Sequence, residues 1–162
     1  MASLRDVMVY FCKLYPYPQE LSNARLTKMV YLADWRSAIR RGRQVSDVNW
    51  YFNHYGPYVN DVVKTAERDR AFVLSAESNL YGAGKTVIQV QADADYPSVT
   101  SEDKEILDFV IDRTKRLYWA DFLKLVYSTY PVLTRPRYAY LDLVELAHDY
   151  AGDEEVLASA TE

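Results

Sequence analysis

The fold of this chain is decided by residues 22–42, which read SNARLTKMVYLADWRSAIRRG. Ser22 is of a type that caps helix N-termini, and Gly42 is of a type that ends helices in the left-handed conformation. Between these two residues the hydrophobic positions form two opposed stripes, Leu26, Met29, Val30 and Ala33 on one side and Tyr31, Trp35, Ala38 and Ile39 on the other. A helix that is hydrophobic on two sides packs on two sides, so we expect the central helix of the fold here.

Helix and strand patterns continue on both sides of this segment. The residues at 45–55 are rich in β-branched and aromatic types and predict a short extended segment. Helical spacing or helix start signals predict further helices over residues 4–15, 57–68, 100–117, 118–130 and 138–150, and two β-type runs predict a hairpin of residues 71–74 and 86–90. We therefore expect a mainly α (α+β) fold, a compact bundle of about six helices around a central helix, with a small β-hairpin.

Length and composition limit the domain organisation and the partners. The 162 residues fit one domain, which we expect over residues 1–152, followed by a disordered acidic tail over residues 153–162. The net charge is −4, whereas nucleic-acid binders usually carry a basic excess, so nucleic acid is not the expected partner. Cys12 is the one cysteine, which fits a reducing cytoplasm, and no run approaches the ~18 apolar residues that a membrane span needs.

The motifs of catalytic sites are weak in this sequence. Residues 82–86, GAGKT, end like a phosphate-binding loop, but Asn79 stands where that loop needs glycine and a strand-like run follows at 87–90. His54 and His148 lie in no metal-ligand spacing and are interpreted as helix-packing or capping residues. We therefore expect no catalytic residue, no metal and no cofactor, and the protein is not expected to be an enzyme.

Two groups of side chains are candidates for partner contacts. The basic cluster at the end of the central helix is either a solvated helix end, stabilised by the helix dipole, or a dock for an acidic partner or nucleic acid. It comprises Arg36, Arg40, Arg41 and Arg43. Tyrosine, with 15 copies, fills cores and also lines contact surfaces. The aromatic candidates are Tyr51, His54, Tyr55 and Tyr58, with Tyr81 at the hairpin tip.

A composite motif links the central helix to the segment after it. Residues 26–35, LTKMVYLADW, are followed by residues 53–59, NHYGPYV. This resembles the SocA-like (Panacea) antitoxin domain, in which an LxKLlYlA helix precedes a YGP turn and another helix. The residues that carry the motif are Leu26, Lys28, Tyr31, Trp35, Gly56 and Pro57. We expect most of it to be scaffold, with Gly56 allowing a tight turn and Pro57 starting the next helix.

The likeness continues into the second half of the chain, over residues 101–103, 118–123 and 130–131, so that it spans roughly residues 4–135. The resemblance implies an antitoxin that holds a protein toxin, often encoded beside it in prophages and other mobile elements. Relatives neutralise by direct binding or by delivering the toxin to an ATP-dependent protease, and no chemical step is expected. A nucleic-acid-associated regulator that uses the basic cluster is the alternative, and self-association of the chain stays open.

Overall fold

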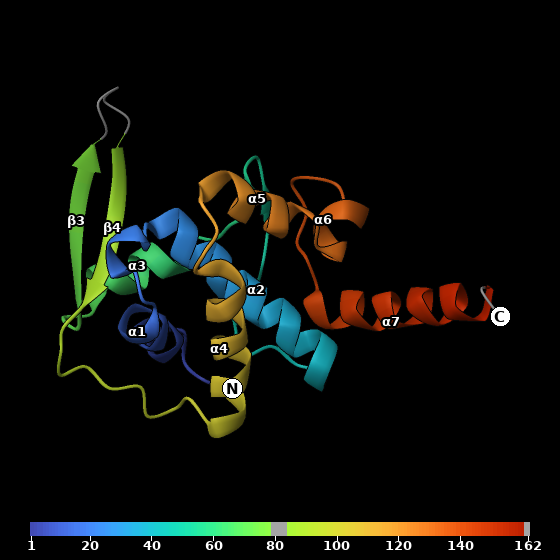
Figure 1. Ribbon diagram of the computed structural model, residues 1–162, viewed down its shortest axis with the longest axis horizontal. Coiled ribbons are helices and arrows are strands. Elements are labelled where there is room, and N and C mark those ends of the chain that lie inside the picture. Colours follow the sequence, from blue (N-terminus) through green and yellow to red (C-terminus); the bar gives the residue numbers. More distant parts are fainter. Residues whose placement is uncertain (79–83, 161–162) are drawn as a thin grey trace.

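The central helix is α2, Asn23–Arg41, and the other elements lie around it (Figure 1). The structure, a computed structural model, describes residues 1–78 and 84–160, with side chains up to residue 153. In chain order its elements are α1 (Leu4–Leu14), the 3-10 turn η1 (Pro18–Glu20), α2, β1 (Phe52–Asn53), β2 (Gly56–Pro57), α3 (Asp61–Arg68), β3 (Phe72–Ser78), β4 (Gly84–Val90), α4 (Ser101–Thr114), α5 (Trp119–Tyr127), α6 (Tyr130–Thr134) and α7 (Leu143–Ala160). Seven helices and two antiparallel two-stranded sheets in the described residues confirm the predicted mainly α fold with a small β component.

Both ends of α2 are capped as the sequence predicts. The Ser22 side chain accepts a hydrogen bond from the Arg25 backbone N–H at 3.1 Å, which satisfies one of the free amides of the first turn. At the other end Gly42 has φ +71°, and its N–H donates to the Ala38 carbonyl at 3.0 Å. These caps fix the length of the helix that contacts α1, α3, α4, α7 and β4.

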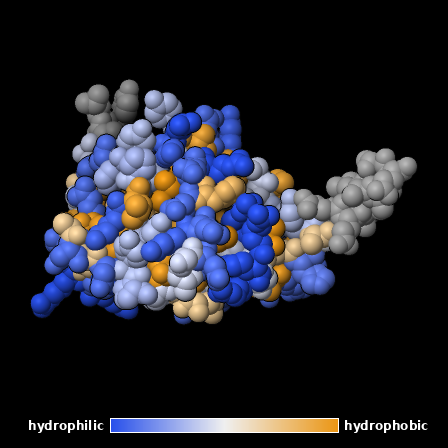
Figure 2. Space-filling model, turned by 60° about the horizontal axis from the view of Figure 1, so that its bottom comes forward, coloured by the Kyte–Doolittle hydropathy of each residue, from blue (hydrophilic) through white to orange (hydrophobic). Residues whose placement is uncertain are grey.

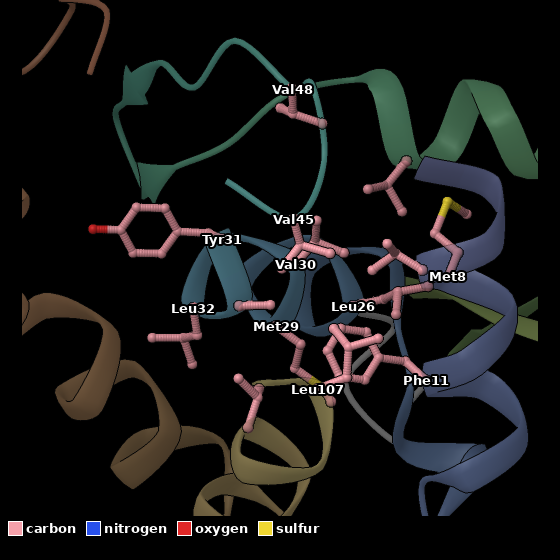
Figure 3. Packing of buried hydrophobic residues seen from close by; sticks show 14 of the residues in the cluster. Met8, Phe11, Leu26, Met29, Val30, Tyr31, Leu32, Val45, Val48 and Leu107 are labelled. Atoms are coloured by element: carbon pink, nitrogen blue, oxygen red, sulfur yellow. The ribbon is translucent and has the colours of Figure 1, made fainter. Parts of the chain in front are cut away.

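The two hydrophobic stripes of α2 pack against different neighbours. Figure 3 shows Leu26, Met29 and Val30 among side chains of α1, α4 and the loop after α2, whereas Tyr31 points to the opposite side. The Tyr31 ring meets Trp50 edge-on, with 5.5 Å between the ring centroids. The prediction for Ile39 is wrong: its side chain is 37% exposed, because the last turn of α2 reaches solvent.

The segment after α2 differs from the prediction at Pro57. This residue lies in β2 opposite Phe52 of β1, and α3 begins only at Asp61. The chain stays extended because it finds partners: the Tyr58 N–H donates to the Tyr51 carbonyl at 3.0 Å. Pro57 therefore ends a hairpin instead of starting a helix.

A distant segment also pairs with β1 and shifts the start of the last helix. The Phe52 N–H donates to the Ala139 carbonyl at 2.9 Å, and Tyr51 forms an isolated β-bridge with Tyr140. Residues 138–141 are thus not helical, with Tyr138 at φ +66°, and α7 begins at Leu143, not at residue 138 as predicted. Its backbone is helical up to Ala160 and projects from the rest of the molecule (Figure 1). The division between a domain of residues 1–152 and a tail of residues 153–162 stays a prediction.

The predicted helix over residues 118–130 is divided in two. Helix α5 ends at Tyr127, and a short helix, α6, begins at Tyr130. Pro131 therefore does not end a helix, as predicted, but stands in the first turn of α6. Proline is tolerated there because a first-turn amide has no partner within the helix.

The hairpin of β3 and β4 pairs from Phe72 opposite Val90 to Ser78 opposite Gly84. It is joined to the start of α2, because the Ile88 N–H donates to the Leu21 carbonyl at 2.9 Å. Residues 84–86 are part of β4, so the helix that a phosphate-binding loop needs after its threonine does not follow, and the hairpin interpretation is confirmed. Tyr81 at the tip lies outside the described residues.

Candidate partner-binding site

A cavity of about 470 Å³ lies beside the N-terminal half of α2. Its walls come from α2, from the β1–β2 hairpin with the residue after it, and from α5. The lining residues are Ala24, Lys28, Asn53, Tyr55, Tyr58, Trp119, Leu123 and Tyr127. A second cavity of about 560 Å³ shares Ala24 and Trp119 with the first and extends to the start of β4. The lining of this cavity thus combines aromatic residues with one lysine, and it includes residues of the composite motif of α2 and the β1–β2 hairpin.

Lys28 is the unusual member of this lining. Its side chain is only 2% exposed, and its ammonium has no hydrogen-bond or ion-pair partner among the residues that the structure describes. Burial lowers the pKa of Lys28 to about 8, because a charged group loses its hydration. The Lys28 Nζ is not among the fully buried polar atoms that lack a partner, so the ammonium keeps some accessible surface, while burial of the rest of the side chain disfavours its charged form.

Gly56 lies against the ring of Tyr127, one of the residues that line the cavity. Gly56 has φ +95°, and a Cβ atom there would lie 2.7 Å from Cε1 of the Tyr127 ring. The Tyr127 hydroxyl donates to the Tyr55 carbonyl at 2.8 Å. Glycine at this position therefore serves two needs, a positive φ and the close approach of α5 to the hairpin.

Asp34 is a second buried charge of α2, and it is fully paired. Its carboxylate accepts hydrogen bonds from the Ser46 N–H at 2.8 Å, the Ser46 hydroxyl at 2.6 Å and the Trp50 Nε1–H at 2.8 Å. Burial raises the pKa of Asp34 to about 6, and the hydrogen bonds from Ser46 and Trp50 oppose that rise. Asp34 thereby holds the loop after α2 against the helix.

Arg25 is a third buried charge, and it also serves the fold. Its Nη2 donates to the carbonyl oxygens of Thr114 at 2.8 Å and Leu117 at 2.9 Å, so it satisfies free carbonyls at the end of α4. The guanidinium also lies 4.4 Å from the centroid of the Phe122 ring. The burial of all three charged residues could have been predicted from the sequence, because a helix that is hydrophobic on two sides leaves little surface in contact with solvent.

The predicted aromatic contacts fall into two places. Tyr55, 73% exposed, and Tyr58, half-buried, line the cavity. Tyr51 is half-buried and lies edge-on to Tyr140, with 5.1 Å between the ring centroids. His54 is exposed in the turn between β1 and β2, where its Nδ1 lies 3.2 Å from a tyrosine hydroxyl. Its interpretation as a helix-packing or capping residue is therefore wrong.

The basic cluster lies at the other end of α2, away from the cavity. Lys28 and Arg40 are twelve residues apart, which corresponds to ~18 Å along a helix axis. Arg41 donates to Asp103 of α4 at 2.9 Å, and the Arg36 guanidinium lies 3.8 Å from the centroid of the Phe109 ring. Only Arg40 and Arg43 of the four arginines are exposed without such a contact to a neighbouring element.

Large exposed aromatic side chains gather at the rim of the cavity. Trp119 is 44% exposed and lines this cavity together with the exposed Tyr55, and Tyr118, 84% exposed, lines the adjoining cavity. On the face drawn in Figure 2, hydrophobic residues form separate patches among hydrophilic ones. None of the helices over the described ranges is long and apolar enough to cross a membrane.

Other candidates for chemistry are accounted for by the fold. Cys12 is buried in α1, and burial raises the pKa of its thiol to about 12, so it is not a reactive thiolate. Within the described part of the chain no three His, Cys, Asp or Glu side chains come together in a way that would hold a metal ion.

The motif residues of α2 and of the β1–β2 hairpin thus lie together in space. The protein is a small helical domain with a cavity, lined by aromatic residues, beside its central helix. The family model of the antitoxin SocA-like, Panacea domain matches residues 26–131. Because this match covers well over half of the chain, the protein belongs to that family. Comparison with curated proteins and with solved structures gave no match.

Proposed function

We propose that this protein is the antitoxin of a toxin–antitoxin pair and that it neutralises its toxin by binding it, with no chemical step. The family match over residues 26–131 is the observation that carries this proposal. The surface around the cavity supports it, because exposed Tyr and Trp side chains supply much of the binding energy of protein interfaces. Tyr55 and Trp119 are such side chains, on two elements that meet at the cavity.

Two modes of neutralisation follow from the family. In sequestration the antitoxin holds the toxin in an inactive complex, and in delivery it presents the toxin to an ATP-dependent protease. The amount of toxin in the cell separates the two modes. Sequestration leaves the toxin at a constant level, whereas delivery makes it disappear when the antitoxin is induced and preserves it in cells that lack the protease.

The test is co-expression with the product of the neighbouring gene. We expect rescue of growth and a complex that co-purifies, whose mass also shows whether the antitoxin self-associates. Tyr55→Ala should weaken neutralisation without changing stability, because the ring is largely exposed. Leu26→Asp serves as the unfolding control, since it buries an unpaired charge in the core. A neighbouring product that is not toxic, or toxicity that the full chain does not relieve, would contradict the proposal.

The alternative, a regulator that binds nucleic acid through the basic cluster, has less support. Arg36 and Arg41 make contacts within the fold, which leaves Arg40 and Arg43 for phosphates on a protein of net charge −4. Binding to duplex DNA that falls steeply with added salt would favour this alternative, because phosphate contacts release counterions. Arg40→Ala distinguishes the two uses of the cluster: it weakens neutralisation if the arginine meets an acidic toxin surface, and DNA binding if it meets phosphate.

A further inference from the structure

We infer that the cavity around Lys28 receives an acidic side chain of the partner protein, an aspartate or glutamate flanked by hydrophobic residues. This inference rests on the proposed function, since it gives the chemistry of the partner at the same site. It begins from the one buried ammonium of α2 that the fold leaves without a partner among the described residues.

The charge of Lys28 is not compensated from within the cavity. The lining holds tyrosine, tryptophan, leucine, alanine and asparagine side chains, and it holds no carboxylate. Glu20 lines only the adjoining cavity, which also contains Arg25 and Lys85. A buried ammonium is stabilised mainly by a nearby opposite charge, so a carboxylate from outside the chain is the group that this position lacks.

The number of charges favours a carboxylate over a phosphate. One ammonium balances the single charge of a carboxylate, whereas phosphate groups are usually bound by several cationic or backbone donors. The lining residues include several with donor side chains, the Lys28 ammonium with the Asn53 amide, the Trp119 indole and tyrosine hydroxyls. Capture of a chain's terminal carboxylate generally uses a nest of backbone N–H groups, so the lining fits an acidic side chain better.

The walls and the rim determine what flanks the carboxylate. The aliphatic stem of an aspartate or glutamate would pack on the Leu123 and Tyr127 side chains of α5, which line the cavity. Tyr55 and Trp119 at the opening are exposed and can cover neighbouring hydrophobic residues of the partner. A segment with a hydrophobic–acidic–hydrophobic pattern matches both parts.

The test uses short peptides, so it does not depend on the identity of the toxin. The Lys28 side-chain resonances of the full chain are followed by NMR during titration with acetyl-Ala-Leu-Glu-Leu-Ala-amide. The same sequence with Gln for Glu removes the charge, and the Gln peptide with a free C-terminus offers only a terminal carboxylate. We expect the Glu peptide to shift the Lys28 resonances and to bind about tenfold more tightly than the Gln peptide, as one ion pair worth about 1.4 kcal/mol implies.

Variants locate the effect. Lys28→Met keeps the length of the side chain and removes the charge, so it should abolish the preference for Glu over Gln. Lys124→Met is the matched control, because this lysine of α5 does not line the cavity and its side chain is 82% exposed, and it should leave the preference unchanged. The contrast between the peptides on the unmodified chain remains decisive if the Lys28→Met variant does not fold.

Three results of the peptide titrations would overturn the inference: equal binding of Glu and Gln peptides or no binding, a preference for the free C-terminus, or displacement of the Glu peptide by oligothymidylate. The first excludes charge recognition, the second assigns the cavity to chain ends, and the third assigns it to nucleic acid. Failure of the proposed function is a separate result, namely toxicity that the full chain does not relieve although the preference for the Glu peptide persists. If the toxin is neutralised equally well by the Lys28→Met variant, the antitoxin role stands and the cavity is not its recognition site.

Discussion

Two charged side chains of α2 are buried almost equally and surrounded very differently. Asp34 is inaccessible to solvent and accepts hydrogen bonds from Ser46 and Trp50 at 2.6–2.8 Å. Lys28, six residues earlier, is 2% exposed, lines a cavity, and has no such partner in the described part of the chain. One helix thus carries a charge whose burial three hydrogen bonds partly offset, since the pKa of Asp34 is still raised to about 6, and a charge without such bonds.

The difference separates stability from binding along a single helix. Burying a charge is unfavourable unless hydrogen bonds or an opposite charge replace its hydration. At Asp34 the replacement comes from the loop that the carboxylate fixes, so this residue belongs to the fold. At Lys28 the replacement is left to a partner. Changes at the two positions should therefore affect stability with opposite signs.

The largest effect is expected for Asp34→Asn. The amide group cannot accept from all of the donors of Ser46 and Trp50 and places its own N–H₂ against them, so we expect a loss of about 3 kcal/mol in the free energy of unfolding. Urea denaturation measures this loss. The control is Asp121→Asn on α5, where the side chain is 63% exposed and the change should stay within about 0.5 kcal/mol. Equal stability of the two variants would remove the contrast between Asp34 and Lys28.

The sequence predicted the fold where its signals were local. The caps at Ser22 and Gly42, the two stripes of α2 and the β3–β4 hairpin follow from residue types and spacing, and the structure confirms them except at Ile39. The predictions failed where long-range pairing decided the conformation. Pro57 was expected to start a helix, but the hairpin of β1 and β2 and the distant segment at residues 138–141 hold the chain extended.

The candidate site was predicted only in part. Tyr55 and Tyr58 were chosen as aromatic residues near the motif, and both line the cavity. Lys28 was recognised as a motif residue but not as a site, because the spacing of one helix does not show that α5 closes over it. The basic cluster lies at the C-terminal end of α2, whereas the cavity lies beside its N-terminal half, and no pattern in the sequence indicated this cavity.

A change at Gly56 tests the wall of the cavity without touching either charge. Gly56→Ala should lower the free energy of unfolding by about 2 kcal/mol, because alanine is strained at φ +95° and its Cβ would overlap the Tyr127 ring. In the Tyr127→Ala variant the overlap is absent and only the backbone strain remains. Gly56→Ala should therefore cost less stability in that variant than in the unmodified protein. Gly152→Ala in α7 is the control, since nothing lies within 4 Å of its added Cβ. If Gly56→Ala lowers the free energy of unfolding equally with and without Tyr127→Ala, the close approach of Gly56 to Tyr127 does not contribute to the loss.

Lys28→Met should change the free energy of unfolding in the opposite direction from Asp34→Asn. Replacing an uncompensated buried ammonium with an apolar side chain of similar length should raise the free energy of unfolding at pH 7 by about 1–2 kcal/mol. The pKa of Lys28 is lowered from 10.5 to about 8 by burial, so the folded protein loses this proton first and becomes more stable as the pH rises from about 8 to 10.5. The advantage of the variant should therefore shrink between pH 7 and pH 10 in urea denaturation. A variant that is less stable than the parent at pH 7 would mean that Lys28 is compensated within the fold.

The smallest effects are expected at the C-terminal end of α2, where a paired and an unpaired arginine stand side by side. Arg41→Ala removes the ion pair with the buried carboxylate of Asp103 and should cost about 1 kcal/mol of stability. Arg40→Ala, at an exposed position, should change stability by less than about 0.5 kcal/mol. The same rule that separates Asp34 from Lys28 then holds on the surface: an arginine that the fold uses affects stability, and one that it leaves free affects only a partner. If Arg40→Ala destabilises the protein as much as Arg41→Ala does, pairing within the chain does not distinguish the residues of the fold from those of the binding surface.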